Sequence, residues 1–260
     1  MSNEPGLRAL IITQDEPFFL PRALERLYAQ TKGRHQIVGC ILLSASPFGK
    51  KESFIQKALK TRAVFGNAFF LRYALRFVWN KLTNPNAMEK VLQSHGTPII
   101  RLDQSINAAE SLDLIRKHNP DILLSIAGNE IFKRPLIDLA PKGCLNLHTA
   151  LLPKYRGLMP SFWVLKNREP ETGVSIFLVD EGIDSGPIVV QKPVQIGDMT
   201  QEQLIRHTKD LGMDGMAEAL DIMAQPAPDL IENNADDATY FTFPTAQDVA
   251  EFRRAGAKFF

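Results

Sequence analysis

The sequence predicts an α/β protein in which helices cover both faces of a mainly parallel sheet. Short apolar, β-branched runs recur along the chain, and segments with a helical spacing of apolar residues separate them. The runs predicted to form strands are residues 7–13 (LRALIIT), 36–44 (QIVGCILLS) and 121–126 (DILLSI). Strands that alternate with helices favour a parallel sheet, which is buried on both faces.

Three segments supply the predicted helices. Residues 16–30 (EPFFLPRALERLYAQ) repeat their apolar side chains at helical spacing, and residues 105–119 read as a capped helix that ends before a proline. Residues 200–223 begin with Thr200 and Gln203, which have the spacing of a capping box. The sequence therefore places a helix between successive predicted strands and a longer helix after them.

The pattern changes from Gly173 onward. Residues 173–180 (GVSIFLVD) and 187–196 (PIVVQKPVQI) are strand-like, and the turn-rich sequence EGIDSG separates them. These two runs predict a β-hairpin. We expect residues 1–225 to form one domain and residues 226–260 to form an arm that closes against its core and ends in a small helix.

Residues 54–82 differ from the rest of the chain and mark a basic, aromatic insertion at about residues 50–85. Six basic side chains and no acidic one occur among many aromatic residues. One interpretation is an amphipathic element that contacts a membrane surface or a partner, including a second copy in a homodimer. The other is a pair of helices whose aromatic residues pack on the body while the basic residues stay solvated.

Composition excludes several classes of protein. Thirty basic and 29 acidic side chains give a net charge of +1, so the chain as a whole lacks the basic footprint of a nucleic-acid-binding protein. The two cysteines, Cys40 and Cys144, lie within apolar runs, which argues against a disulfide framework or a thiolate metal site. No secretory leader or run of eighteen apolar residues occurs, so we expect a cytoplasmic protein without a bound metal.

A candidate polar site begins in residues 144–157 (CLNLHTALLPKYRG). Asn146 and His148 are two residues apart in a predicted strand and therefore share one face. If the strand from Gly173 pairs beside them, the turn after it brings Asp184 to the same sheet edge. An Asn, a His and an Asp together can move a proton and stabilise an oxyanion. Each of them alone is also a common turn or strand-end residue.

Residues 121–197 resemble the catalytic core of the folate-dependent formyltransferases. The resemblance is carried by N-x-H, by the following LLPKYRG and by an aspartate with D-x-G spacing some three dozen residues later. This family includes glycinamide ribonucleotide, methionyl-tRNA and sugar-nucleotide formyltransferases. The resemblance implies a Rossmann-like domain over residues 1–225 and formyl transfer from 10-formyltetrahydrofolate to a primary amine, without a metal.

The resemblance also assigns the site residues. It implies that Asn146, His148 and Asp184 are the catalytic trio, in which Asn146 and a protonated His148 donate to the oxyanion and Asp184 orients His148. The residues implied for folate binding are Ala127, Gly128, Asn129, Glu130, Ile131, Phe132, Asp180, Glu181, Gly182 and Ile183. The residues expected on the acceptor side are Pro153, Lys154, Tyr155, Arg156 and Gly157.

The resemblance is strongest to the sugar formyltransferases, which implies a nucleotide-linked amino sugar as acceptor. Methionyl-tRNA formyltransferases usually carry a further C-terminal RNA-binding domain, and we expect no nucleic acid as partner. Residues 13–19 (TQDEPFF) lack the glycine-rich phosphate loop of glycinamide ribonucleotide enzymes. The alternatives are formyl transfer to methionyl-tRNA or to glycinamide ribonucleotide, and hydrolysis of 10-formyltetrahydrofolate by water. A further alternative is a folate-binding protein without catalytic activity.

Overall fold

The structure is a computed structural model that describes residues 6–43 and 54–260, with only the backbone of Phe54 and Lys57. Ser44, the last residue of one predicted strand, lies outside the described residues. Residues 1–5, part of the N-terminal segment in which no secretory leader is expected, also lie outside the described residues. So do residues 50–53, the first residues of the predicted insertion.

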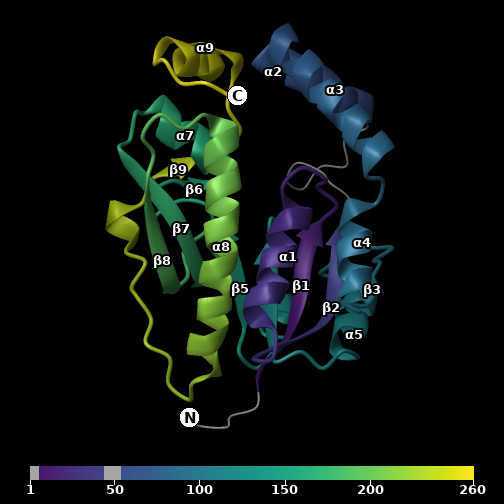
Figure 1. The fold of residues 1–260 in the computed structure, drawn as a ribbon. Helices are drawn as coiled ribbons and strands as arrows, with labels where there is room; N and C mark the ends of the chain where they lie inside the picture. The colour runs from purple at the N-terminus through teal and green to yellow at the C-terminus, as the bar shows by residue number, and fades with distance from the viewer. Residues whose placement is uncertain (1–5, 44–53) are drawn as a thin grey trace.

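A seven-stranded sheet forms the centre of the molecule (Figure 1). Its strands, in spatial order, are β3 (Ile99–Ile100), β2 (Gln36–Leu43), β1 (Arg8–Gln14), β4 (Ile122–Ile126), β5 (Cys144–His148), β7 (Glu171–Leu178) and β8 (Ile188–Gln195). The first five run parallel, whereas β7 is antiparallel to both β5 and β8. The predicted fold class and the predicted hairpin are therefore confirmed.

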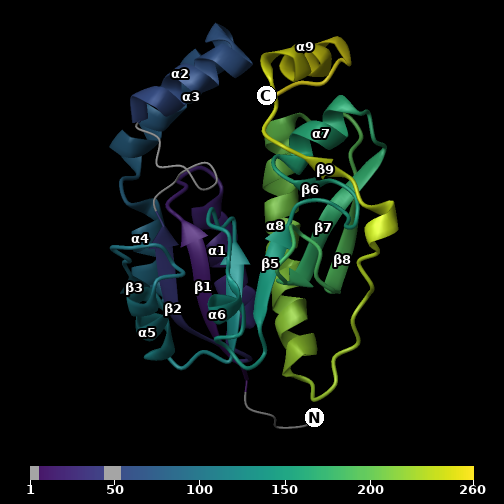
Figure 2. The same cartoon turned by 180° about the vertical axis from the view of Figure 1, so that it is seen from behind.

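Helices cover both faces of this sheet (Figures 1 and 2). One face packs against α1 (Leu20–Thr31), α4 (Ala87–Ser94) and α8 (Gln201–Ala224), and the other against α5 (Ala109–Arg116) and α6 (Arg134–Ile137). The parallel strands are almost wholly buried, which explains why they read as continuous apolar runs.

The remaining elements belong neither to the sheet nor to the helices that cover its two faces. They are α2 (Phe54–Phe65), α3 (Asn67–Thr83), β6 (Arg156–Gly157), α7 (Pro160–Lys166), the 3₁₀ helix η1 (Ala235–Asp237), β9 (Tyr240–Phe241) and α9 (Ala246–Arg254). Figure 1 shows α2, α3 and α9 beyond the carboxyl ends of the parallel strands. Residues 226–260 contain β9 and α9 and contact the rest of the chain through the β6–β9 pair. The boundary at residue 225 stays a prediction.

The predicted N-terminal cap is present in α8 but absent from α5. Helix α8 has the expected capping box between Thr200 and Gln203. Helix α5 begins at Ala109 without a side-chain cap, because its N-cap residue is Ala108, which has no polar side chain. Among the described residues, no helix is long and apolar enough to cross a membrane.

Candidate active site

Strand β5 presents Asn146 and His148 on one face of the sheet. The alternate residues Leu145 and Leu147 point into the core on the other face, where Leu147 packs against Gly212 of α8. Asn146 is half-buried and His148 is buried. Strand periodicity therefore supplies two polar side chains on one face while the apolar side chains hold the strand in place.

Asp184 reaches His148 by a longer route than the sequence suggested. Because β7 is antiparallel to β5, its last residues lie at the amino end of β5, where the Val179 N–H donates to Cys144 O at 2.8 Å. His148 stands at the other end of β5, yet Asp184 Oδ2 lies 3.5 Å from His148 Nδ1. Residues 179–187 therefore fold back along β5 rather than ending at the same sheet edge.

The two ring nitrogens of His148 have different partners. Nε2 lies 2.7 Å from the Tyr155 carbonyl oxygen, which can only accept, so this nitrogen carries a proton and donates. Nδ1 faces the Asp184 carboxylate at 3.5 Å. A neutral His148 therefore leaves Nδ1 able to take up a proton beside a carboxylate, and an imidazolium would have an acceptor on each side.

Asp184 is fixed by backbone contacts. Its Oδ2 accepts a hydrogen bond from the Gly157 N–H at 2.8 Å, and its side chain is 14% exposed. Its φ is +49°, a left-handed conformation that aspartate tolerates better than most residues. The Asp184 carboxylate thus links the loop after β5 to the loop after β7, and these two loops form opposite sides of the candidate site.

The loop expected on the acceptor side divides into an inner and an outer part. The Tyr155 ring is buried and stacks on Phe241, and its hydroxyl donates to Glu169 at 2.6 Å. Tyr155 therefore faces the core and reaches the site through its backbone carbonyl alone. Lys154 is exposed, whereas Pro153 and Arg156 are half-buried.

The first loop expected to bind folate, residues 127–132, is braced by the preceding loop. The Glu130 carboxylate accepts from the Ser105 hydroxyl and from the Ile106 N–H, at 2.7 and 3.2 Å. Asn129 and Phe132 are buried, and the Ile131 side chain is 67% exposed. The loop thus has a fixed backbone and one apolar side chain that faces solvent.

The second loop expected to bind folate, residues 180–183, closes on itself. Asp180 Oδ1 accepts from the Gly182 N–H at 3.0 Å and from the Ser185 hydroxyl at 2.7 Å. Ile183 is 54% exposed. The second loop therefore holds its backbone through its own Asp180, whereas the first is anchored to a neighbouring loop through Glu130, and each loop exposes one isoleucine.

Sequence reasoning missed Asn233, which ties the C-terminal segment to Asp184. Its Nδ2 donates to the carbonyl oxygens of Asp184 and Gly186, both at 2.9 Å, and its Oδ1 accepts from the Arg156 guanidinium at 2.8 Å. Thr239 adds a second tie, since its hydroxyl accepts from the Tyr155 N–H at 2.8 Å. These partners are 47 to 84 residues apart in sequence, so local patterns carry no signal for them.

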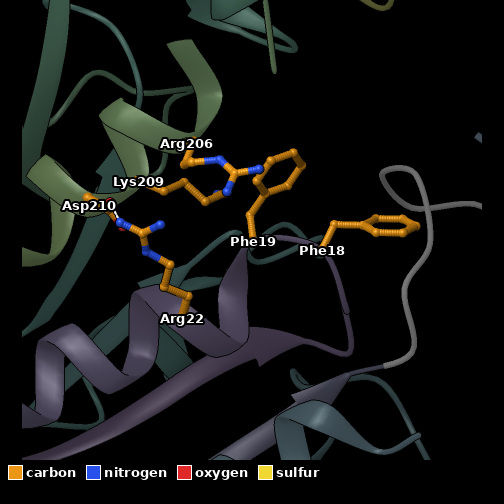
Figure 3. A pocket seen from close by; sticks show the side chains of 6 residues that line it. All are labelled: Phe18, Phe19, Arg22, Arg206, Lys209 and Asp210. Carbon is orange, nitrogen blue, oxygen red and sulfur yellow. Dashed lines mark hydrogen bonds and ion pairs between the residues drawn. The ribbon is translucent and has the colours of Figure 1, made fainter. Parts of the chain in front are cut away.

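Two cavities lie away from these residues. One is a cavity of about 20 Å³ between α1 and α8. Figure 3 shows its lining, in which Arg22 pairs with Asp210 beside Phe19 and Lys209. Burial lowers the pKa of Lys209. This volume fits a single water rather than a pterin. A larger hollow of about 410 Å³ lies at the amino end of β5, beside Gly143 and Cys144.

Within residues 6–43 and 54–260, no group of three or more His, Cys, Asp or Glu side chains could hold a metal ion.

Known proteins resemble this chain in sequence. A methionyl-tRNA formyltransferase from Citrifermentans bemidjiense is 35% identical over 157 residues, which are 60% of this chain and 48% of that protein. One from Kosmotoga olearia is 39% identical over 112 residues, 43% of this chain and 36% of that protein. The chain thus spans about half or less of the length of the curated relatives it matches.

Solved structures resemble it in fold. Glycinamide ribonucleotide transformylase 1 from Symbiobacterium toebii has a TM-score of 0.61 at 15% identity and covers 88% of this chain and 95% of that one. A sugar N-formyltransferase from Shewanella sp. has a TM-score of 0.58 at 18% identity, and the match covers 95% of this chain and 87% of that one. The family model described as formyl transferase matches residues 80–220, more than half of the chain. The chain therefore belongs to the formyl transferase family.

Proposed function

We propose that this chain transfers a formyl group from 10-formyltetrahydrofolate to a primary amine at Asn146, His148 and Asp184. The observation that carries the proposal is the buried His148 ring, whose Nδ1 faces Asp184 at 3.5 Å on the strand face that also bears Asn146. A proton acceptor, a carboxylate and an amide donor are the groups that amine attack on a formyl carbon needs.

The chemistry follows from these groups. The amine nitrogen bonds to the formyl carbon, the carbonyl oxygen becomes an oxyanion, and the bond from that carbon to the folate nitrogen then breaks. Asn146 donates to the oxyanion from its side-chain amide. His148 Nδ1 takes the proton that the amine loses, Asp184 stabilises the imidazolium, and the same proton passes to the departing folate nitrogen.

Two features of the site support folate as the formyl donor. Hydrogen bonds hold both loops: Glu130 anchors residues 127–132 to Ser105 and Ile106, and Asp180 closes residues 180–183 on themselves, which suits recognition of a flat heterocycle by N–H and C=O groups. The exposed Ile131 and Ile183 offer apolar surface to an aromatic ring. One solved relative, an N-formyltransferase from Helicobacter canadensis, has folinic acid and dTDP-3-aminofucose in its complex.

The acceptor we propose first is the amino group of methionine on a transfer RNA. The supporting observation is that the relatives with 35% and 39% identity are methionyl-tRNA formyltransferases. The nucleotide-linked amino sugar expected from the sequence becomes the second candidate. It is favoured by a sugar N-formyltransferase structure that covers 95% of this chain, although at 18% identity.

An acceptor panel tests both the reaction and the acceptor. The protein is incubated with 10-formyltetrahydrofolate and, separately, with methionyl-tRNA, a set of nucleotide-linked amino sugars, glycinamide ribonucleotide or no amine. Tetrahydrofolate release and the mass of each acceptor are followed. We expect a formyl gain on one amine that matches the release of tetrahydrofolate. Release without any amine indicates hydrolysis, and no release with any acceptor contradicts the proposal.

A further inference from the structure

Helix α3 exposes a stripe of large apolar side chains. Leu71, Leu75, Val78 and Leu82 are spaced four, three and four residues apart, so they lie on one face of the helix. Trp79 extends this face, and the five side chains are 54–75% exposed. We call these five residues the outer stripe. Eight of the fourteen exposed large apolar side chains in the described chain lie on α2 and α3.

The opposite face of α3 holds the helix on the body. Phe69 packs on Phe259 with ring centroids 5.0 Å apart, and Tyr73 packs on Phe18 at 5.2 Å. Arg76 forms an ion pair with Glu202 of α8, at 2.9 Å. Phe69 and Tyr73 are therefore accounted for by contacts with the body. The outer stripe takes no part in them and points away from the body.

The surroundings of the outer stripe are basic. Six Lys and Arg residues and no Asp or Glu occur in residues 54–88. Arg72 and Lys81 are both exposed, and at about 100° per residue they flank the stripe on its two sides. An apolar stripe bordered by cations, with a tryptophan among its members, has the composition of helices that lie in a membrane interface.

The charge decides between two kinds of occupant. A second copy that paired its α3 with this one would bring further cations to the stripe and no acidic side chain, because residues 54–88 contain no Asp or Glu. Such a pairing leaves Arg72 and Lys81 without an acidic partner on the facing helix. A surface of anionic lipid headgroups instead complements Arg72 and Lys81 and accepts the apolar side chains between them.

We propose that the outer stripe of α3 docks on a membrane surface that contains anionic lipids. Helices α2 and α3 lie beyond the carboxyl ends of the parallel strands, the end at which His148 stands (Figures 1 and 2). The docked protein thus turns the end that carries the candidate site towards the membrane. This proposal does not depend on formyl transfer, and its test needs no substrate.

Vesicle binding by the full chain tests the proposal. Sedimentation with phosphatidylcholine vesicles is compared with sedimentation with vesicles that also contain about 30% phosphatidylglycerol, at low salt and at about 0.5 M NaCl. We expect binding to the anionic vesicles, weaker by about tenfold or more without the anionic lipid or at high salt. Trp79 reports the contact directly, since the other tryptophan, Trp163, is 7% exposed. Its emission should shift to shorter wavelength on binding, and Trp79→Phe should lose that shift.

Matched variants separate the stripe from other exposed leucines. Leu75→Gln and Leu71→Gln should each weaken vesicle binding by about tenfold. Both side chains are exposed, so neither change should lower the melting temperature, which is measured in parallel. Leu114→Gln, on an exposed position of α5, is the control and should bind vesicles as the parent chain does.

Three results would overturn the proposal. The first is the absence of binding to anionic vesicles by the folded chain. The second is equal binding by the parent chain, Leu75→Gln and Leu71→Gln. The third is a mass of two chains in solution that falls to one chain in Leu75→Gln without any vesicle binding, which would assign the stripe to a second copy.

Discussion

At the residue scale, Gly157 must donate a hydrogen bond to Asp184 and must adopt a positive φ. Its N–H donates to Asp184 Oδ2 at 2.8 Å, and its φ is +94°, where a side chain is strained. A Cβ at this position would lie 2.2 Å from the Phe241 carbonyl oxygen, inside van der Waals contact. Gly157 is thus the β6 residue that both pairs with β9 and orients Asp184, and only glycine fits there.

Gly157→Ala should therefore reduce formyl transfer strongly. The backbone must move away from Phe241, which displaces the N–H from Asp184, and a misplacement of about 1 Å can cost about a hundredfold in rate. Gly197→Ala is the matched control, because Gly197 also has a positive φ but has open space around it. Both changes cost about 1–2 kcal/mol for the left-handed conformation. Steady-state rates and melting temperatures of the two variants check this, and equal rates would contradict it.

Asn233 should act as a positioning residue for Asp184. Asn233→Ala removes its hydrogen bonds to Asp184 O, Gly186 O and Arg156, so we expect kcat to fall by about tenfold or more while the KM for the acceptor changes little. Asn234→Ala is the neighbouring control, because Asn234 only caps η1. A purely structural role for Asn233 would instead lower the melting temperature without this difference between kcat and KM.

At the scale of elements, α9 is joined to α7 by charge. Lys166 of α7 lies 2.8 Å from both Asp248 and Glu251 of α9. Burial alone would raise the pKa of Asp248, but hydrogen bonds from Lys166 and Thr245 outweigh burial and lower it below its ordinary value of 3.8. A lowered pKa in the folded state means that the carboxylate stabilises the fold above its unfolded pKa, and that this stabilisation is lost as pH falls through the folded pKa.

Asp248→Asn should consequently destabilise the protein at neutral pH but not in strong acid. Asparagine can still cap α9 with Thr245, so the change isolates the charge. The melting temperature of the variant should lie below that of the parent at pH 7, and the difference should shrink below about pH 4. Thermal unfolding of both proteins from about pH 2.5 to 7 checks this. A difference that stays constant with pH would contradict the charge account.

The elements show which parts of the fold local sequence encodes. Buried strands such as β1 and β4 were predictable because continuous apolar runs need no partner to be recognised, and α8 was predictable from its capping box. The two-residue strands β6 and β9 were not, because each exists only through the pairing of Arg156 with Tyr240 and of Gly157 with Phe241. The route of residues 179–187 along β5 depends likewise on the antiparallel direction of β7.

At the scale of the whole molecule, one cysteine lies in the hydrophobic core on each face of the sheet. Cys40 belongs to the core that α1, α4 and α8 cover, and Cys144 to the core on the other face. Burial raises the pKa of each thiol to about 12. Both should stay unreactive towards a thiol reagent at pH 8, because the thiolate is the reactive form.

Global unfolding should expose both thiols together. Modification by a chromogenic disulfide reagent is followed across a urea gradient, with Cys40→Ala and Cys144→Ala used to assign each thiol. We expect the two thiols to become reactive at one denaturant concentration, because both faces of one sheet unfold together. If one thiol reacts well below that concentration, the core on its side opens independently.

The candidate site was partly predictable for the same reason as the fold. Asn146 and His148 share a face through strand periodicity, which a single sequence reveals. Asp184 was found by its motif spacing, but its contact with His148 rests on a loop that folds back and on Asn233, 49 residues further along the chain. Long-range placement of that kind leaves no local pattern.

Formyl transfer through His148 and Asp184 is the central claim, and one measurement tests it most directly. Single-turnover transfer of a labelled formyl group from 10-formyltetrahydrofolate to the acceptor found in the panel is compared for the parent chain, His148→Ala and Asp184→Asn. Folding is checked by melting temperature, and folate binding by direct titration. The account predicts that both variants bind folate, while their transfer rates fall by about a hundred- to a thousandfold. Transfer near the parent rate in either folded variant would contradict it.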